Sequence, residues 1–575
     1  MKKIAILLLS VMVAFTSCNI LNNDPDDSFT KSNYFTSVEN VELFANYFYS
    51  AFSGYSGDFY FNILNDDQAK TGVELWTFMQ QPATASAWNS PYSNIRRCNL
   101  LIEAIPNIES MTTAQANHWM GVARLMRAWY HYKVVRGFGD CYWVNHVLDA
   151  SKDADVLYGP RTDRDIVMDS ILADLNFAVE NITLNSTSRT VFNEYVANAM
   201  KAEICLYEGT FCRYRSEADG QKAPNETRAQ QYLRECCNAC EVILGSGKFS
   251  LTPKYSAVYT SLNLEGNPEM ILYKHYAYPM LGHSVIDYTC GSTQVNGMTK
   301  DAFNSYLSAD GDLMTYGDDH GVLVGGKPSI AAQIARRDPR LACHVDALLQ
   351  FPGNDVVRFA DDEAGKNASS STSSTGYGVL KFDTKEIDRV RRQSIGQGDT
   401  DAPIFWLAVI FLNYAEAKAE LGEFDATVQG LTLDKLRARA GNIWGFSATV
   451  VDPRNNMGVS SLLYEIRRER RVELMYDIND RYYSLLRWHK LDLLDTNLHP
   501  DIKKGAWIGT AADADKLFNV EAAELAGTNH PDVDEDGYID CSSGNNRIYD
   551  KKYYLFPIPS DQQTLNPAIG QNPGW

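Results

Sequence analysis

The sequence predicts a mainly α-helical fold, built from tetratricopeptide-like helix pairs (an α-solenoid scaffold) with a loop-rich irregular substructure packed on it. Apolar residues recur at helical spacing in one stretch after another along the first 248 residues and again after residue 410. Many of these expected helices follow each other across short turns, and they carry alanines at positions suited to close packing. Helix pairs of this kind stack to bury a face that no single pair can bury alone.

The expected helices follow from apolar spacing, acidic first turns and glycine stops. Gly139, Gly245 and Gly422 each follow one of them directly or within a few residues. In chain order, the predicted helices are Val38–Phe52, Tyr92–Ile105, Ala114–Val135, Asp163–Val179, Glu194–Glu208, Thr227–Leu244, Phe411–Leu421 and Leu433–Ala440.

Two regions lack a sustained helical period, Phe249–Ile410 and Asn497–Asn546. The first is rich in glycines and aromatic residues and contains a Ser/Thr tract at Ser369–Thr375. We expect irregular, loop-rich substructures here. Loops held by a rigid scaffold carry a disproportionate share of binding groups.

The N-terminus has the features of a secretory signal. Lys2 and Lys3 precede an apolar run, which ends in small residues and Cys18. The run is too short to span a bilayer as a helix. Cys18 follows the small residues directly, as in a bacterial lipobox, and would be the acylated first residue of the mature chain; an ordinary signal peptide cleaved nearby is the alternative.

Charge excludes one class of partner. The formal net charge is −19, whereas a nucleic-acid binder needs a basic footprint to displace counterions from phosphate. Catalytic motifs are also missing: the sequence has no HExxH, GxSxG, P-loop or dinucleotide fingerprint. A secreted glycosidase stays open as an alternative, because sequence does not show how far apart two carboxylates lie.

The stretch Leu462–Trp488 contains a dense Arg/Glu lattice. Glu465, Glu469 and Glu473 recur every four residues, a spacing that is mildly destabilising in an isolated helix. Interleaved arginines offset this repulsion, so we expect an internal ion-pair network that holds neighbouring helices in register.

This stretch, together with the closing segments LFPIP and NPxxxQNPGW and the helix segments NIRRCNLLIEAIP and ARLMRAWYHYKVVRGFGD, resembles the SusD/RagB family of surface lipoproteins. The resemblance implies four tetratricopeptide-like helix pairs. It also implies a lipid-anchored outer-membrane protein on the cell surface that captures oligosaccharide without catalysis and delivers it to a SusC-like TonB-dependent transporter. RagB-type relatives imply peptide as the alternative cargo.

The resemblance also suggests where ligand would bind. Glycan-binding members of the family use two loop regions, and both carry aromatic and polar residues here, a mixture suited to sugar rings and hydroxyl groups. The expected ligand-binding residues are Trp88, Asn94, Tyr276 and Tyr278, with weaker assignments for Asp66 and Trp76. A core position or a transporter-facing position is the alternative for each aromatic residue.

A possible structural calcium site lies near the C-terminus, and no catalytic cofactor is expected. Asp532, Asp534, Asp536 and Asp540 occupy loop positions one, three, five and nine of an EF-hand pattern, with Gly537 at six and the Tyr538 carbonyl at seven. Position twelve is Ser543 and not the usual Glu, so an acidic turn without metal is the alternative.

The cysteines favour buried thiols. Cys236, Cys237 and Cys240 share one predicted helix, and Cys205 and Cys212 lie on its expected partner. They lack the paired CxxC spacing of structural zinc sites, and a disulfide is the next alternative.

The chain divides into five expected parts. They are the signal peptide (1–17), the acylated tether (18–32), an N-terminal helical part (33–248), a loop-rich insert (249–408) and a C-terminal part with the last helical pair and the closing segment (409–575).

Overall fold

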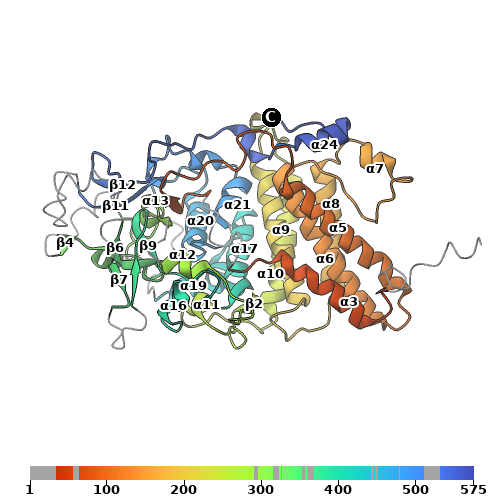
Figure 1. The fold of residues 1–575 in the computed structure, drawn as a ribbon, viewed down its shortest axis with the longest axis horizontal. Helices are drawn as coiled ribbons and strands as arrows, with labels where there is room; N and C mark the ends of the chain where they lie inside the picture. Colours follow the sequence, from red (N-terminus) through yellow and green to blue (C-terminus); the bar gives the residue numbers. More distant parts are fainter. Residues whose placement is uncertain are drawn as a thin grey trace, which may run out of the picture.

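The protein is an array of antiparallel helices with a loop-rich end, as a computed structural model shows (Figure 1). The structure describes residues 34–55, 64–290, 296–314, 323–324, 327–351, 356–360, 368–441, 446, 451–477, 480–509 and 531–575. Cys18 and the signal peptide lie outside the described residues. None of the described helices is both long enough and apolar enough to cross a bilayer.

The helical array confirms the predicted fold class. Each long helix packs on the next: α5 on α6, α6 on α8, α8 on α9, α9 on α10, α10 on α17, and α17 on α20. The main helices are α3 (Val38–Ala45), α5 (Ser86–Ala104), α6 (Thr113–Phe138), α8 (Arg164–Asn181), α9 (Glu194–Tyr214), α10 (Glu226–Gly245), α17 (Leu407–Glu420), α19 (Leu433–Arg439), α20 (Ser461–Glu473) and α21 (Asp480–Arg487).

Local sequence explains where the helices begin and end. Thr112 caps α6 in a reciprocal capping box with Gln115, and Asn193 caps α9 through its side-chain oxygen. Gly139 ends α6 at φ 71°, a conformation that is accessible to glycine without strain. The prediction was wrong at the start of α5, which begins six residues before Tyr92 and so places Trp88 on a helix and not on a loop; Asn94 lies on the same helix.

The loop-rich end contains short antiparallel strand pairs among the described residues. They are β1 (Gln68–Lys70) with β3 (Asn296–Met298), β2 (Met270–Lys274) with β10 (Ala402–Trp406), β4 (Leu323–Val324) with β5 (Lys327–Pro328), β6 (Val345–Gln350) with β9 (Gly376–Val379), β7 (Val356–Arg358) with β8 (Ser369–Ser371), and β11 (Lys504–Trp507) with β12 (Tyr538–Asp540). Two of these pairs, β1–β3 and β2–β10, join segments more than one hundred residues apart.

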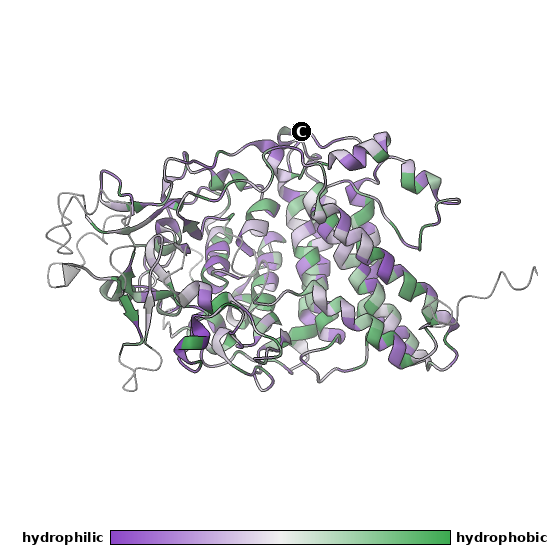
Figure 2. Ribbon diagram, viewed as in Figure 1, coloured by the Kyte–Doolittle hydropathy of each residue, from purple (hydrophilic) through white to green (hydrophobic). Residues whose placement is uncertain are grey.

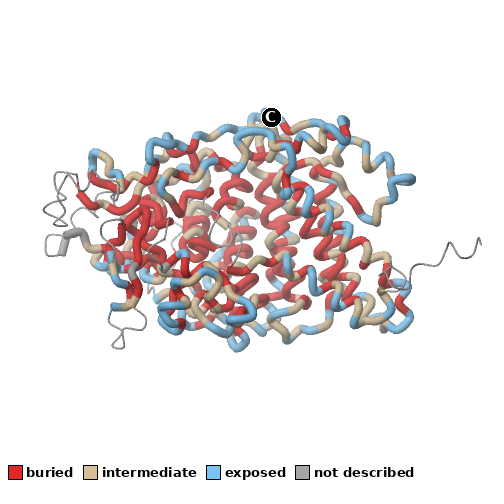
Figure 3. Tube along the Cα trace, viewed as in Figure 1, coloured by how far each residue is buried: buried red, intermediate tan, exposed pale blue. Residues whose placement is uncertain are grey.

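Burial follows the helical array. Buried backbone runs through the middle of the helices, and exposed backbone lies at the loops around them (Figure 3). Hydrophobic and hydrophilic residues alternate along the helices (Figure 2), as expected when opposite faces meet different surroundings. Cys205, Cys212, Cys236, Cys237 and Cys240 are buried free thiols, which confirms the interpretation of these cysteines.

The Arg/Glu lattice is buried and holds the end of the array together. Glu416 of α17 accepts hydrogen bonds from Arg470 of α20 (3.1 Å), from Arg487 of α21 (2.5 and 2.8 Å) and from the indole N–H of Trp488 (2.8 Å). Burial would raise the pKa of Glu416, but the Arg487 and Arg470 guanidinium groups hold it at about 2. The expected internal network between helices is confirmed.

The same lattice reaches distant parts of the chain. Glu469 pairs with Arg340 (2.5 Å) and Arg437 (2.7 Å). Arg471 pairs with Asp67 (2.7 Å), next to β1, and with Asp301 (2.8 Å). The lattice therefore attaches the loop-rich end to the last helical pair.

The closing segment lies across the N-terminal helices, near the top of Figure 1. Asn572 donates hydrogen bonds to the carbonyl oxygens of Phe138 and Phe556, and its own side-chain oxygen accepts one from Arg161 (2.7 Å). The Phe556 N–H donates to the Gly137 carbonyl (2.7 Å). The LFPIP and QNPGW motifs therefore fasten the chain's end to the end of α6.

Candidate functional site

Trp88 and Trp76, two of the three expected ligand residues with buried rings, lie in the core. Trp88 is 3% exposed and packs edge-on against Phe138, with ring centroids 5.0 Å apart. Trp76 stacks on Tyr553 at 4.6 Å, and its indole N–H donates to the Ile548 carbonyl. Neither ring presents an open face to a sugar, because helix packing and the closing segment cover both.

Asp66 has arginine partners. Its carboxylate accepts two hydrogen bonds from Arg481, at 2.7 and 2.6 Å, and lies 3.4 Å from Arg471. Burial opposes ionisation, yet these two guanidinium groups lower the pKa of Asp66. This carboxylate therefore belongs to the lattice.

Asn94 lies apart from the remaining expected residues. Its side chain donates to the Ser90 carbonyl one turn earlier on α5 (3.0 Å). It also lines a groove of about 390 Å³ between α5, α6 and α21. Tyr276 and Tyr278, in contrast, belong to the loop that follows β2, near the base of the loop-rich end.

Tyr276 and Tyr278 differ in exposure although they are two residues apart. Tyr276 is buried, donates its hydroxyl to the Ser53 carbonyl (3.2 Å) and packs edge-on against His283. Tyr278 is 41% exposed. Of the expected aromatic ligand residues, Tyr278 alone has a substantially exposed ring.

Tyr278 lies on an exposed surface made by two loops, which we call the Tyr278 surface. Its exposed hydrophobic members are Tyr278, Met280, Leu281, Tyr288, Val390 and Ile395. The first four lie on the β2–α12 loop and on α12 (Val285–Cys290), and the other two lie on and just after α16 (Arg389–Arg392). The helices α12 and α16 pack against each other.

Glycines allow the two loops to approach each other closely. A Cβ atom on Gly282 would lie 2.0 Å from the Gly396 carbonyl oxygen, and one on Gly398 would lie 2.7 Å from the His283 ring. His283 and Gly398 also form an antiparallel bridge. A larger side chain at either glycine would separate the loops.

Charged groups border the exposed rings. The Arg391 guanidinium lies 4.6 Å from the centre of the Tyr278 ring and pairs with Asp399 at 2.6 Å. Asp287, beside Tyr288, has a pKa raised to about 6 by burial. An exposed ring next to a guanidinium can stack on the apolar face of a ligand, and polar groups beside it can hydrogen-bond hydroxyl groups.

Sequence reasoning missed Arg391 as a neighbour of Tyr278, and it missed Ile395 as an exposed residue of the same surface. Arg391 and Ile395 lie more than one hundred residues further along the chain, and no local pattern marks them. The exposed Ile395 is the available signal, because a large apolar residue in a polar loop indicates an interaction surface.

The Asp532 loop is a closed turn. Asp534 pairs with Lys504 (2.6 Å), and its other carboxylate oxygen accepts from the N–H groups of Asp536 and Tyr538. The Tyr538 carbonyl accepts from the Asp534 N–H (2.9 Å). These oxygens already have protein partners, so calcium would have to displace Lys504; calcium at this loop stays a prediction.

The helical array and the exposed Tyr278 surface define a class of protein: a helical repeat scaffold with exposed aromatic rings on its loops. A family model described as "SusD family" matches residues 286–575, and one described as "Starch-binding associating with outer membrane" matches residues 32–206. The first match spans half of the chain, so this chain belongs to the SusD family.

Relatives and solved structures agree with this family. A SusD-like protein from Formosa agariphila is 27% identical over 218 residues, which are 36% of this chain and 42% of that protein; a second from the same organism is 25% identical over 240 residues, 38% and 46%. The matches span less than half the length of these relatives.

The solved structures cover nearly the whole chain. A SusD-like carbohydrate-binding protein from Bacteroides fragilis has a TM-score of 0.68 at 18% identity, over 93% of this chain and 100% of that one. A laminarin-binding SusD-like protein has a TM-score of 0.54 at 19% identity, over 93% and 98%. Because the sequence identities are only 18% and 19%, these structural similarities show that this chain shares the fold of the two proteins.

Proposed function

We propose that this chain captures an oligosaccharide at its Tyr278 surface and passes it to a SusC-like TonB-dependent transporter. The observation that carries the proposal is the exposed Tyr278 ring, fixed by Arg391 on a loop of a SusD-family scaffold. One family model that matches this chain is described as starch-binding. The two solved structures described as carbohydrate-binding and laminarin-binding support the same cargo class.

The chemistry of the site suits a sugar. Arg391 lies over one face of the Tyr278 ring, so a sugar would stack its apolar C–H face on the opposite side. The hydroxyl groups of the sugar would then hydrogen-bond to polar groups that border the ring. The interaction is reversible recognition, and no bond of the sugar is cut.

Anchoring follows from Cys18. A family model that matches this chain names association with the outer membrane, and a lipid on Cys18 would hold the folded body at that surface. Several acyl chains give a stable anchor, where a single chain is marginal.

The test is a binding panel of glycans and peptides on the full chain purified in detergent, measured by calorimetry. We expect at least one oligosaccharide to bind, Tyr278→Ala to weaken it, and Tyr158→Ala to leave it unchanged. Tyr158 lies on α7 (Ala154–Tyr158) and is also exposed, so it is a matched control. Equal binding by both variants would remove Tyr278 from the site.

Peptide is the second candidate cargo, because the Tyr278 surface also exposes aliphatic side chains. Met280 is 88% exposed and Ile395 is 78% exposed, and such side chains suit apolar peptide residues more than sugar hydroxyl groups. Peptides that bind in the panel while every glycan fails would favour this alternative. A bound glycan that is shortened over days would instead indicate a glycosidase.

A further inference from the structure

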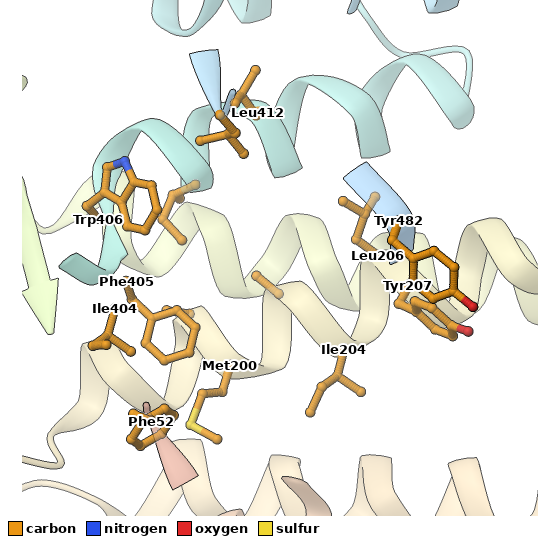
Figure 4. Close-up of a cluster of buried hydrophobic side chains, with 14 of the residues drawn as sticks. Phe52, Met200, Ile204, Leu206, Tyr207, Ile404, Phe405, Trp406, Leu412 and Tyr482 are labelled. Atoms are coloured by element: carbon orange, nitrogen blue, oxygen red, sulfur yellow. The ribbon is translucent and has the colours of Figure 1, made fainter. Parts of the chain in front are cut away.

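A cavity lies inside the helical frame, between α6, α9, α17 and α21, and we call it the Arg136 cavity. Its volume is about 210 Å³, somewhat more than the roughly 150 Å³ that holds a benzene ring in a protein core. Its walls include the rings of Phe52, Trp129, Tyr207, Phe405, Trp406 and Tyr483. In Figure 4, Phe52 and Phe405 lie near Met200, Trp406 lies beyond Phe405, and Tyr207 lies further along α9.

Arg136 lines this cavity without a carboxylate partner. Its guanidinium lies 3.4 Å from the centre of the Tyr483 ring and 5.0 Å from that of Tyr132, and no ion pair within 4.0 Å joins it to any of the described residues. Arg470 and Arg487, which line the same cavity, are both paired with Glu416. Arg136 therefore has an available fork of donors that fits a carboxylate.

Three further donors around the cavity have no acceptor. They are the indole N–H groups of Trp129 and Trp406 and the side-chain amide nitrogen of Asn413, and all three residues are more than nine-tenths buried. The Asn413 orientation is fixed, because its oxygen accepts a hydrogen bond from Arg470 (2.5 Å). Buried polar groups in proteins are nearly always hydrogen-bonded, so these donors indicate an acceptor-bearing ligand or ordered water.

The cavity is partly open to solvent, because several of the residues that line it, such as Lys133, Arg136 and Glu203, are only half-buried. Lys133, Arg136 and Tyr483 line both the cavity and the groove of about 390 Å³ that contains Asn94. Ser86 and Ser90 on α5 form an exposed rim of that groove. A ligand could therefore reach the cavity from its open side without displacing Arg136.

We propose that the Arg136 cavity is a second ligand site, which binds a small ring-bearing carboxylate. Arg136 holds the carboxylate, the aromatic walls cover the ring, and the donors of Trp129, Trp406 and Asn413 bind the remaining oxygens. The size fits one six-membered ring with its acid group, and the excess of unpaired donors favours an acceptor-rich, anionic ligand. The site is separate from the Tyr278 surface and independent of the cargo bound there.

Glu203 makes binding depend on pH. It lines the cavity, and burial raises its pKa to about 7. The charged groups around it are Lys133 and Arg136 on α6, Arg470 on α20 and Asp480 on α21. Protonated Glu203 can donate a hydrogen bond to the ligand, whereas its carboxylate repels the ligand. If only the protonated form accepts ligand, affinity falls roughly tenfold from pH 6 to pH 8.

The test is calorimetry on the full chain in detergent with two acids, benzoate and D-glucuronate, and their neutral counterparts, benzyl alcohol and D-glucose. We expect at least one of the two acids to bind with an affinity roughly tenfold or more higher than that of its neutral counterpart. The two acids separate an aromatic acid from a sugar acid. Asp477 also lines the cavity, and burial raises its pKa to about 6, so it could cause a pH dependence of its own. Glu203→Gln distinguishes the two carboxyl groups, because it should remove the pH dependence if Glu203 causes it.

Variants connect the binding to the cavity. Arg136→Gln should weaken the acid roughly tenfold or more, and Arg96→Gln, at an exposed position of α5, should not. Val409→Phe fills the cavity from a partly exposed position and should abolish binding even if Arg136→Gln unfolds the chain. Tyr278→Ala should leave acid binding unchanged.

Three results would overturn the proposal. If the cavity were merely apolar, a neutral probe would bind as tightly as its acid, so equal affinity for the two counts against the proposal. Acid binding that survives Val409→Phe places the acid elsewhere. No binding of either acid at millimolar concentration means that the cavity holds water only.

Discussion

Glu416→Gln should destabilise the fold more than any surface charge change. The carboxylate is fully buried and receives hydrogen bonds from Arg470, Arg487 and Trp488. Its pKa of about 2 against an ordinary 4.5 corresponds to about 3 kcal/mol of folding free energy, at about 1.4 kcal/mol per pKa unit. Removing one partner of a buried ion pair costs a similar amount, roughly 3–5 kcal/mol.

The expected melting shift follows from the size of the chain. An unfolding entropy of about 2.1 cal/mol/K per residue gives about 1.2 kcal/mol/K for 575 residues. A loss of about 3 kcal/mol then lowers the melting temperature by about 2 to 3 °C if the body unfolds as a unit. Differential scanning calorimetry measures this shift directly. The control is Glu423→Gln, an exposed partner of Lys418 (3.2 Å), for which under about 1 kcal/mol is expected.

The pH dependence tests the same reasoning. Because the folded state depresses the pKa of Glu416, its stabilisation is present above the unfolded value of 4.5 and is lost as pH falls towards 2. The difference in melting temperature between the original chain and Glu416→Gln should therefore narrow from about pH 6 to about pH 3. A difference that is constant with pH, or a Glu416→Gln shift no larger than that of Glu423→Gln, would refute the electrostatic account.

Four further outcomes are expected. Tyr278→Ala should weaken binding of the cargo by roughly 1–3 kcal/mol in calorimetry, as the loss of a stacked aromatic anchor does elsewhere, whereas Tyr158→Ala should not. Trp88→Ala should instead lower stability, by roughly 3–5 kcal/mol in chemical denaturation, and a stable variant with impaired binding would contradict its placement in the core. Cys18→Ala should release the chain from the membrane fraction, and unchanged fractionation would exclude acylation there. A chelator should lower the melting temperature if the Asp532 loop holds calcium, and an unchanged value indicates a turn closed by Lys504 alone.

The helical frame could be predicted because its signals are local. Apolar spacing, caps and glycine stops act within a few residues, and they place α6, α8, α9 and α10 within several residues of their observed ends. The start of α5 was missed because proline usually interrupts a helix, and Pro91 lies inside α5, five residues after its first residue.

The candidate site could be predicted only in part. Composition indicated that exposed aromatic residues would matter, and the β2–α12 loop does carry Tyr278. Exposure of any one ring depends on what packs over it, however, and Trp88 and Trp76 are covered by Phe138 and by Tyr553 of the closing segment. No property of the tryptophans themselves distinguishes a core ring from a surface ring.

The sequence by itself determined the helical class, the family and the role of the Arg/Glu lattice, because helix periodicity and a dense run of paired charges are written in neighbouring residues. Tertiary structure alone decided which residues meet. It brought Arg391 to Tyr278 and left Arg136 without a carboxylate while Arg470 and Arg487 share Glu416. The physical reason is that burial and charge pairing arise from contacts between distant segments, and these contacts separate a structural arginine from one available to a ligand.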